Sequence, residues 1–312
     1  MPTKTWFDGF RMKRELYLGD VKITMPRIRR SKKTISAVFF NKTVFIFDEN
    51  DKIVTNYHFF FALSTIMTKR KRSMKAASLS IIIPTLNEKC NILPLISQIQ
   101  KNIHPKEIIV VDDNSPDKTG ALVERYRHQH KDVKLIINKP RLGLTKSLQK
   151  AIDASSGIYI AWMDADFTHP PNLLPDMMMA IKNCDIVVGS WLIKGGREVR
   201  KEKLHRFFSL AINKICSQVF FSSIQAYTSG YILTKKSVLD TQPLRGNYGE
   251  YCIDFLVRNQ RKQKKIVEIP ITCISRVNGQ SKTCPDMKTY LVNGLRYLRM
   301  VTALLINNGE KL

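Results

Sequence analysis

The sequence lacks a long apolar run. Its longest apolar stretch near the N-terminus, residues 53–67, is interrupted by Asn56, Tyr57 and His58, and it is shorter than the ~20 residues that a membrane-spanning helix needs. We therefore expect a segment that lies on a surface or is poorly ordered, and not a transmembrane helix. The first twenty residues contain no apolar run either, so we expect no signal peptide.

The sequence also lacks a metal-binding cysteine pattern. The six cysteines form no Cys-x-x-Cys pair and have no zinc-like spacing with the six histidines, which excludes the zinc-finger class. We expect reduced, mostly buried thiols in a cytosolic protein. The cysteines are Cys90, Cys184, Cys216, Cys252, Cys273 and Cys284.

Acidic residues are scarce. Lys and Arg number 51 against 26 Asp and Glu, which gives a net charge of +25. Residues 1–77 contribute +11 (17 basic, 6 acidic) and the remainder contributes +14, so the charge is spread along the chain. Such a balance suits nucleic acid, anionic lipid or phosphorylated substrates, and charge alone does not choose among them. The 312 residues, 44% of them hydrophobic, suffice for one large domain with an appendage.

The first 77 residues are predicted to form a separate basic extension. Basic runs lie at 27–33 and 69–72, and residues 44–47 have the composition of a short strand. The second basic run could hold an anionic membrane, or it could simply be solvated. Regular patterning begins just after Met74, so we also consider a translation start there.

From Ser78 onward, short β-rich runs alternate with helical stretches. This alternation predicts an α/β domain with a mainly parallel central sheet. The expected strands are 79–84, 107–113, 133–138 and 158–164, and the expected helices are 87–102, 121–130, 143–154, 201–221 and 287–306. Three of these strands end in acid or amide groups at the edge where open α/β sheets bind ligands.

Asp164 and Asp166 follow the apolar run 158–163 directly. Two carboxylates at the end of a buried strand offer the oxygen ligands that Mg²⁺ or Mn²⁺ prefers, usually together with substrate phosphates. The alternative is a pair of solvated acids at an ordinary strand end, because an isolated Asp-x-Asp tripeptide is common.

Several motifs occur together in the order typical of family 2 glycosyltransferases. They are Ile83–Glu88, Val110–Asp117, Arg141–Leu144, Met163–Asp166 with His169-Pro170, and Gly189-Ser190 before Gly195-Gly196. Arg276–Lys282 is similar to the Arg-x-x-Gly-x-Ser-Lys element of the dolichol-phosphate (polyprenol-phosphate) mannosyltransferases, and Tyr290–Leu298 resembles the closing helix of that subgroup. The resemblance covers about residues 78–300.

The resemblance implies a GT-A (Rossmann-like) nucleotide-sugar-binding domain over 78–300, with a C-terminal tail at 301–312. By motif match, the residues expected to line the nucleoside pocket are Pro84, Leu86, Glu88, Val111 and Asp113. For Asp113 we keep the alternative of capping the next helix, which Asn114 or Ser115 could also do, and Asp112 could equally form a turn.

The same resemblance implies a phosphate and metal site. Asp164, Ala165 and Asp166 would meet the ribose and diphosphate, with Asp166 the expected direct ligand of Mg²⁺ or Mn²⁺ and Asp164 beside it. Arg276 and Lys282 would hold the donor diphosphate and the acceptor phosphate. These four charged side chains are the expected catalytic residues.

The expected reaction moves a sugar, mannose from GDP-mannose in the first instance, to a polyprenyl (dolichyl) phosphate with inversion. The acceptor oxygen is already anionic, so no strong general base is required. We expect a cytoplasmic protein, peripheral at the cytosolic face of a membrane: the endoplasmic reticulum in a eukaryote, the plasma membrane in a bacterium. The expected partners are a nucleotide sugar, the lipid phosphate, an anionic membrane surface and a membrane-anchoring subunit, and not nucleic acid.

The chain departs from the subgroup's pattern at five positions. Leu86 stands for Tyr, Trp191 for Arg, Ala226 for Asp, Ile232 for Arg, and Asp254 for Glu. Loss of an acid and a base together could delete a structural pair without leaving a lone buried charge. It could also mean a different sugar, a different acceptor or weak activity.

Two further hypotheses stay open. The first is a family 2 transferase with another sugar or a saccharide acceptor, for which Asp254 is the candidate base. The second is a catalytically weak homologue that binds anionic lipid or nucleic acid. We expect the apolar face of 201–221 to pack in the core, with lipid contact as the alternative.

Overall fold

The computed structural model describes residues 78–199, 203–276 and 287–306, without the side chains of 203–205 and 287–291, and the backbone of four short strands near the N-terminus. The chain separates into two compact units, Met1–Arg70 and Lys71–Leu312. The boundary predicted at residues 77 and 78 stays a prediction.

The first unit contains two antiparallel hairpins. Strand β1 (Glu15–Leu18) pairs with β2 (Val21–Thr24), and β3 (Ser36–Phe40) pairs with β4 (Thr43–Phe47). Strand β4 confirms the strand predicted at 44–47. The predictions for residues 27–33, 53–67, 69–72 and Met74 fall outside the described residues.

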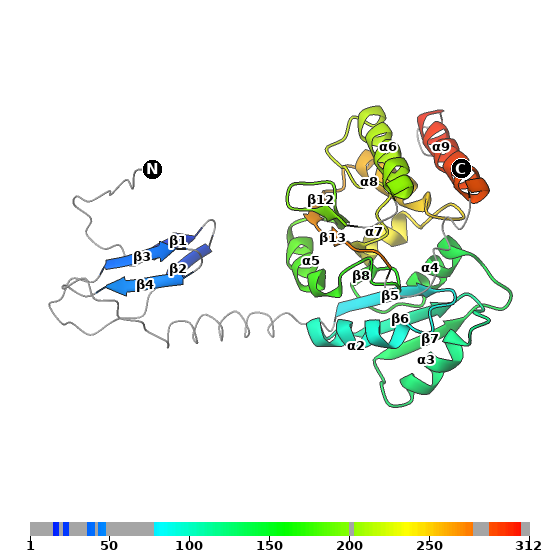
Figure 1. Ribbon diagram of the computed structural model, residues 1–312, viewed down its shortest axis with the longest axis horizontal. Helices are drawn as coiled ribbons and strands as arrows, with labels where there is room; N and C mark the ends of the chain where they lie inside the picture. Colours follow the sequence, from blue (N-terminus) through cyan, green and yellow to red (C-terminus); the bar gives the residue numbers. More distant parts are fainter. Residues whose placement is uncertain are drawn as a thin grey trace. The chain divides into compact units, whose positions relative to one another are not determined.

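The second unit is built on a sheet in the order β12-β9-β11-β8-β5-β6-β7 (Figure 1). Strand β11 runs antiparallel to its neighbours and the other pairings are parallel, which confirms the mainly parallel sheet. The strands are β5 (Leu79–Thr85), β6 (Glu107–Asp112), β7 (Val133–Ile137), β8 (Tyr159–Trp162), β9 (Ile186–Ser190), β11 (Ile232–Lys235) and β12 (Ile266–Pro270). A short parallel pair, β10 (Arg197–Glu198) with β13 (Thr272–Cys273), lies outside this sheet.

Helices cover both faces of the sheet. They are α2 (Ile92–Asn102), α3 (Thr119–Arg127), α4 (Leu144–Asp153), α5 (Leu174–Ala180), α6 (Lys203–Val219), α7 (Lys236–Thr241), α8 (Tyr251–Arg261) and α9 (Met287–Ile306). Two short 3₁₀ helices, Pro171–Leu173 and Ile181–Asn183, flank α5. Most predicted elements are confirmed, with shifts of a few residues at their ends.

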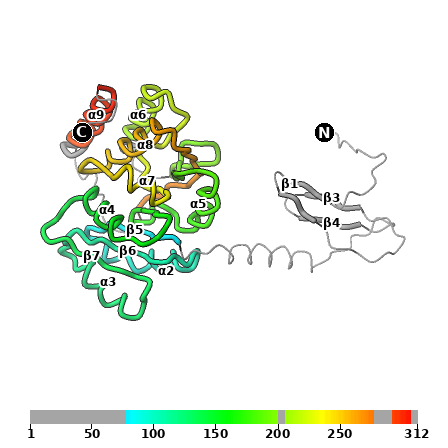
Figure 2. The backbone as a smooth tube through the Cα atoms, turned by 180° about the vertical axis from the view of Figure 1, so that it is seen from behind, coloured from blue at the N-terminus to red at the C-terminus, as the bar shows by residue number. Residues whose placement is uncertain are grey.

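Alternate residues of each central strand enter opposite cores. In β5, Ile82 packs with α4 and α8, whereas Ile81 and Ile83 pack with α2 and α5. Figures 1 and 2 agree that α2 and α3 lie together, away from α6, α8 and α9. Because side chains alternate along a strand, a fully apolar strand needs such a helical layer on each face. The result is a three-layer α/β domain.

Two predictions about helix starts were wrong in detail. Helix α2 begins at Ile92 and not at residue 87, because Asn87 adopts a left-handed backbone with φ of 56°. Helix α3 begins at Thr119, where Asp117 Oδ1 accepts the Thr119 N–H at 2.9 Å. Neither Asp113, Asn114 nor Ser115 caps α3 with its side chain.

Helix α6 is less buried than expected. Cys216 and Asn213 are buried, but Phe207 is 64% exposed and Phe208, Leu210 and Ile215 are also exposed. The prediction that the apolar face of 201–221 packs in the core is therefore wrong for Phe207, Phe208 and Ile215, whereas Ile212 and Val219 pack against the core. Of the five described cysteines all are free and four are buried, as predicted. Among the described helices, none combines the length and the hydropathy needed to cross a membrane.

Candidate active site

The candidate site lies where three neighbouring parallel strands end. Strands β8, β5 and β6 are adjacent and parallel, so the loops that follow them emerge at one edge of the sheet (Figure 1). These loops carry Asp164 and Asp166 after β8, Glu88 after β5, and Asp113 after β6. The sheet thus collects acidic groups from distant parts of the sequence at its carboxyl edge.

Asp166 is buried and fixed by its own loop. Its Oδ1 atom accepts hydrogen bonds from the Thr168 N–H at 3.1 Å and the Thr168 hydroxyl at 2.7 Å. Its Oδ2 atom pairs with Arg276 Nη2 at 2.8 Å. Burial alone would raise the pKa of Asp166, but the Arg276 charge and the Thr168 hydrogen bonds lower it. Asp166 is therefore a buried, ionised carboxylate beside Arg276.

Arg276 connects two of the strand ends. Its Nη1 atom pairs with Glu88 Oε1 at 2.8 Å while Nη2 holds Asp166. Asn91 Nδ2 donates to the other oxygen of Glu88 at 2.7 Å. Only 19% of the Arg276 side chain is exposed. One planar fork thus neutralises carboxylates from β5 and β8.

Asp164 keeps half of its side chain (50%) exposed. Its backbone N–H donates to His169 Nδ1 at 3.0 Å. Desolvation, together with the neighbouring Asp166 carboxylate, raises the pKa of Asp164. Asp164 thus presents an accessible carboxylate close to the buried Asp166.

Hydrogen bonds tie the loop after β5 to the loop after β6. The backbone N–H groups of Asn87, Glu88 and Lys89 donate to Ser115 Oγ at 2.9 Å, Thr119 Oγ1 at 3.0 Å and Asp117 Oδ2 at 3.0 Å. Left-handed backbone occurs in each of the three loops, at Asn87, Asn114 and Phe167. Such conformations cost free energy in non-glycine residues and are concentrated at functional sites.

Asp112 and Asp113 have structural partners. Asp112 accepts hydrogen bonds from Ser115 N and Oγ, which confirms it as a turn former. The carboxylate of Asp113 accepts from Leu142 N at 2.8 Å, Gly143 N at 3.0 Å, Asn138 Nδ2 at 3.1 Å and Ser147 Oγ at 3.2 Å. Desolvation opposes ionisation of Asp113, but these hydrogen bonds outweigh it and lower the pKa. Asp113 therefore orders the start of α4; its contact with a nucleoside stays a prediction.

The remaining predicted site residues differ in accessibility. Pro84 and Leu86 are half-buried at the end of β5, whereas Val111 and Ala165 are buried. Val111 packs in the core under α4, so a ligand could reach it only through its main chain. Lys282 lies outside the described residues.

The donor set fits a divalent ion that is completed by substrate. Within the described part of the chain, no cluster of three or more His, Cys, Asp or Glu forms a ready cage. Mg²⁺ is usually held by one or two carboxylates plus phosphates, and Asp164 and Asp166 supply two. Gly230 lies beside Asp164, where an added Cβ would meet Asp164 Oδ1 at 3.9 Å, an ordinary van der Waals distance. Sequence reasoning overlooked Gly230 and Thr168; the Asp-x-Thr spacing was the signal for Thr168.

The departures from the subgroup pattern are mostly core positions. Ala226 and Ile232 are buried in the same hydrophobic cluster, where a lone charge would have no partner. Trp191 is half-buried against the other core. Asp254 is fully buried, and Arg245 and Arg258 hold its two oxygens at 2.7 Å each. The hypothesis that Asp254 acts as a base for a saccharide acceptor is therefore wrong, because no acceptor can reach it.

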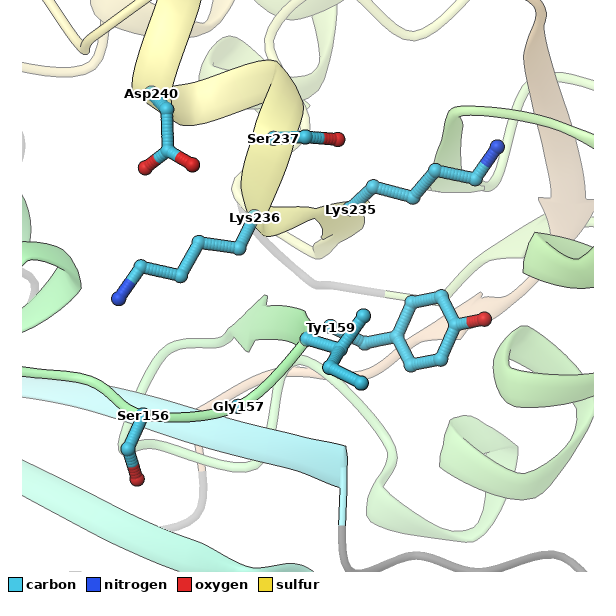
Figure 3. A pocket seen from close by; sticks show the side chains of 8 residues that line it. Ser156, Gly157, Tyr159, Lys235, Lys236, Ser237 and Asp240 are labelled. Atoms are coloured by element: carbon cyan, nitrogen blue, oxygen red, sulfur yellow. The ribbon is translucent and has the colours of Figure 1, made fainter.

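A hollow of about 400 Å³ lies at the opposite edge of the sheet, at the start of β8 (Figure 3). Its lysines already have partners: Lys235 pairs with Asp185 at 2.8 Å, and Lys236 donates to the carbonyl of Ser155. Lys235, at the end of β11, and Lys236, at the start of α7, are therefore already engaged in contacts within the protein. The candidate chemistry lies at the carboxyl edge.

The fold is that of known GT-A glycosyltransferases. It is similar to crystal structures of glucosyl-3-phosphoglycerate synthase from Mycobacterium tuberculosis. One, in complex with Mn²⁺, UDP and glucosyl-3-phosphoglycerate, has a TM-score of 0.57 at 15% identity and covers 75% of this chain and 83% of that chain. Another, with Mg²⁺ and UDP, has a TM-score of 0.55 at 14% identity, over 75% of this chain and 82% of that one. At such identity the likeness concerns the fold.

The family model described as "Glycosyl transferase family 2" matches residues 80–242. This chain therefore belongs to glycosyltransferase family 2, as the motifs indicated. A "Dolichol-phosphate mannosyltransferase" of Pyrococcus furiosus is 31% identical over 237 residues, which cover 74% of this chain and 64% of that protein. An "Undecaprenyl-phosphate mannosyltransferase" of Micrococcus luteus is 27% identical, over 64% of this chain and 85% of that protein. The chain thus spans under two thirds of the length of the Pyrococcus protein.

Proposed function

We propose that this protein is an inverting glycosyltransferase that moves a sugar, mannose from GDP-mannose in the first instance, to a polyprenyl phosphate. The observation that carries the proposal is the convergence of Asp164, Asp166, Glu88 and Arg276 at the carboxyl edge of β5 and β8. The names of the Pyrococcus and Micrococcus relatives support a lipid-phosphate acceptor.

In this proposal Asp164 and Asp166 hold Mg²⁺ or Mn²⁺. Bound there, the ion supplies Lewis acidity to the departing nucleotide diphosphate. Arg276 contributes a second positive charge, since its guanidinium can exchange a carboxylate for phosphate oxygens of similar geometry. Lys282 is proposed to share that role. Pro84, Leu86, Glu88, Val111, Ala165 and Asp113 are proposed to border the nucleoside and ribose.

A phosphate acceptor suits the surroundings better than a sugar hydroxyl. A hydroxyl needs a carboxylate base, and the candidate for that role, Asp254, is buried between two arginines. A polyprenyl phosphate oxygen is already ionised at neutral pH. Alignment of this oxygen by Arg276 and Lys282 then supplies much of the reduction in the barrier to sugar transfer.

Helices α6 and α9 are proposed to rest on an anionic lipid surface. They lie beside each other (Figures 1 and 2) and expose Phe207, Phe208, Leu295 and Leu298, with Leu295 56% exposed. Among the side chains that the structure describes on these two helices, Arg206, Lys214, Arg296 and Arg299 are basic and exposed. Exposed apolar side chains among basic ones favour binding to a membrane interface. We place this surface on the cytosolic face, with a membrane-anchoring subunit as a further partner.

The transfer reaction is tested with the full chain, Mn²⁺, labelled GDP-mannose and a short polyprenyl phosphate. We expect label to enter the lipid fraction, and chelation of the metal to stop it. A panel of other nucleotide sugars tests the choice of mannose. No lipid-linked label from any donor would refute the proposed transfer.

Lipid contact is tested separately by co-sedimentation with vesicles. We expect binding to vesicles that contain phosphatidylserine and little binding to phosphatidylcholine alone. Phe207→Glu should weaken the binding, whereas Asp240→Asn, on α7, should leave it unchanged. Equal binding of wild-type protein to both kinds of vesicle would argue against an anionic surface.

A further inference from the structure

His169 holds the main chain of Asp164 from a fixed position. Its Nδ1 atom accepts the Asp164 N–H at 3.0 Å, and its side chain is only 8% exposed. The ring stacks on Tyr231 with centroids 5.1 Å apart and an interplanar angle of 15°. Tyr231 is itself fully buried, and its hydroxyl donates to the Pro170 carbonyl at 3.0 Å. The imidazole is thus anchored to Tyr231, the residue before β11, and to its own loop.

The direction of this hydrogen bond indicates which ring nitrogen of His169 carries the proton. Nδ1 can accept an N–H only when it carries no proton, so the neutral imidazole carries its proton on Nε2. The distance from Nδ1 to Asp164 Oδ2, 3.8 Å, is too long for a hydrogen bond. The hydrogen bond between His169 and Asp164 thus runs through the Asp164 main chain and not through its carboxylate.

The side chain of Asp164 borders a small space beside Gly230. A Cβ at Gly230 would lie 3.6 Å from His169 Cε1, 3.7 Å from Tyr251 Oη and 3.9 Å from Asp164 Oδ1. Tyr251 is fixed in turn, because its hydroxyl accepts the Trp162 Nε1–H at 2.8 Å. The three side chains thus lie around the Gly230 position.

We propose that His169 is a positioning residue that orients Asp164 for binding a divalent cation. The inference rests on the proposed function, in which Asp164 and Asp166 hold that cation. Asp164 is half exposed, so its order depends on its main chain, and His169 supplies the side-chain acceptor that fixes the main chain. Partners of this kind beyond the metal ligands typically affect metal affinity by about 10–100-fold.

Two amide substitutions at His169 distinguish the role of Nδ1 from that of Nε2. In His169→Asn the amide oxygen can occupy the place of Nδ1, whereas in His169→Gln the amide reaches the place of Nε2. Each full-length variant is titrated with Mn²⁺ in the presence of GDP, and free Mn²⁺ is measured by electron paramagnetic resonance. We expect His169→Asn to bind Mn²⁺ nearly as well as wild type and His169→Gln to bind it about tenfold more weakly.

A third variant separates stacking from hydrogen bonding. His169→Phe retains a ring to stack on Tyr231 but has no acceptor, so we expect a metal-free melting temperature close to that of the wild type and weak Mn²⁺ binding. Nitrogen chemical shifts of His169 should also show the tautomer with the proton on Nε2.

The outcomes distinguish the inference from the proposed function. Wild-type affinity in His169→Gln, or equally weak binding by His169→Asn and His169→Gln, would overturn the positioning role while the metal site stands. If wild-type protein binds no Mn²⁺ with GDP, the proposed metal site fails and this inference fails with it.

Discussion

Two carboxylates in this protein are each paired with arginine, and they differ in what surrounds them. Asp254 is fully buried, and both its oxygens meet guanidinium groups, from Arg245 and Arg258. Arg258 is fixed further by hydrogen bonds to the Gln242 side chain and the Pro243 carbonyl. Asp166 instead pairs with Arg276, which is partly exposed and shared with Glu88.

The difference separates a structural ion pair from an exchangeable one. Removal of either partner at Asp254 would leave a buried charge with no access to water. At Asp166, Arg276 has a second partner in Glu88, and the neighbouring Asp164 is half exposed to water. A ligand can therefore compete for Arg276 and Asp166, and not for the groups around Asp254.

The largest expected effect is on folding, from Asp254→Asn. Loss of the charge strands Arg258 inside the protein, so the free energy of unfolding should fall by about 3–5 kcal/mol. Denaturant unfolding of the full chain measures this. The matched control is Asp240→Asn, at an exposed position on α7, which should change stability by less than about 0.5 kcal/mol. A loss below about 1 kcal/mol in Asp254→Asn would mean that the buried cluster is not structural.

The next largest effect is on catalysis, from Asp166→Asn. Transfer should fall by about 100-fold or more, because a ligand of the metal and a charge near the diphosphate are lost. The free energy of unfolding without metal should change by about 1 kcal/mol or less, since Arg276 keeps its pair with Glu88. Initial rates and denaturant unfolding test the two statements, with exposed Asp176→Asn as the control. Full activity in Asp166→Asn would contradict the metal assignment.

The sequence predicted the sheet edge well because the signal there is local. A run of apolar residues ending in Asp164 and Asp166 reveals a strand and its end within a few positions. Parallel pairing of β5 with β6 and β8 then brings the carboxyl ends of the three strands to one edge. This is why the acids after each strand could be expected at one edge before their contacts were known.

Contacts between distant residues could not be predicted in the same way. Arg276 and Glu88 are 188 positions apart, and nothing in either segment indicates that they pair. The exposure of Phe207, Phe208 and Ile215 on α6 could not be decided, because an amphipathic pattern does not say whether protein or lipid covers the apolar face. Asp254 looked like a free acid because its two arginine partners are recognisable only in three dimensions.

A smaller effect is expected when Arg276 is replaced. In Arg276→Ala, Asp166 loses a competing cation, so Mn²⁺ alone should bind about fivefold more tightly, the effect of roughly 1 kcal/mol from one nearby charge. Affinity for GDP with Mn²⁺ should fall by a similar factor, because the hydrogen bonds that the Arg276 guanidinium donates to the phosphate oxygens are lost. Calorimetric titrations with Mn²⁺ alone and with GDP measure both. Arg276→Lys, which keeps the charge, serves as the control, and changes of the same sign in both titrations would contradict an exchangeable Arg276.

The smallest effect concerns Glu107, a structural carboxylate at the start of β6, away from the site. Burial alone would raise its pKa, but contacts with Lys134, Ser80 and Ser156 lower it from 4.5 to about 2. The resulting stability is complete above pH 4.5 and is lost as the pH falls toward about 2. The full shift corresponds to about 3 kcal/mol, and screening of half-exposed Lys134 reduces this to about 1 kcal/mol.

In Glu107→Gln, unfolding should therefore be easier than in wild type at pH 7, and the difference should shrink between pH 4.5 and about 2. Thermal unfolding across that range measures it. Mn²⁺ affinity at pH 7 should stay at the wild-type value, because Glu107 lies at the opposite end of β6 from Asp113. A difference in stability that is constant with pH would mean that Glu107 contributes through packing and not through its charge.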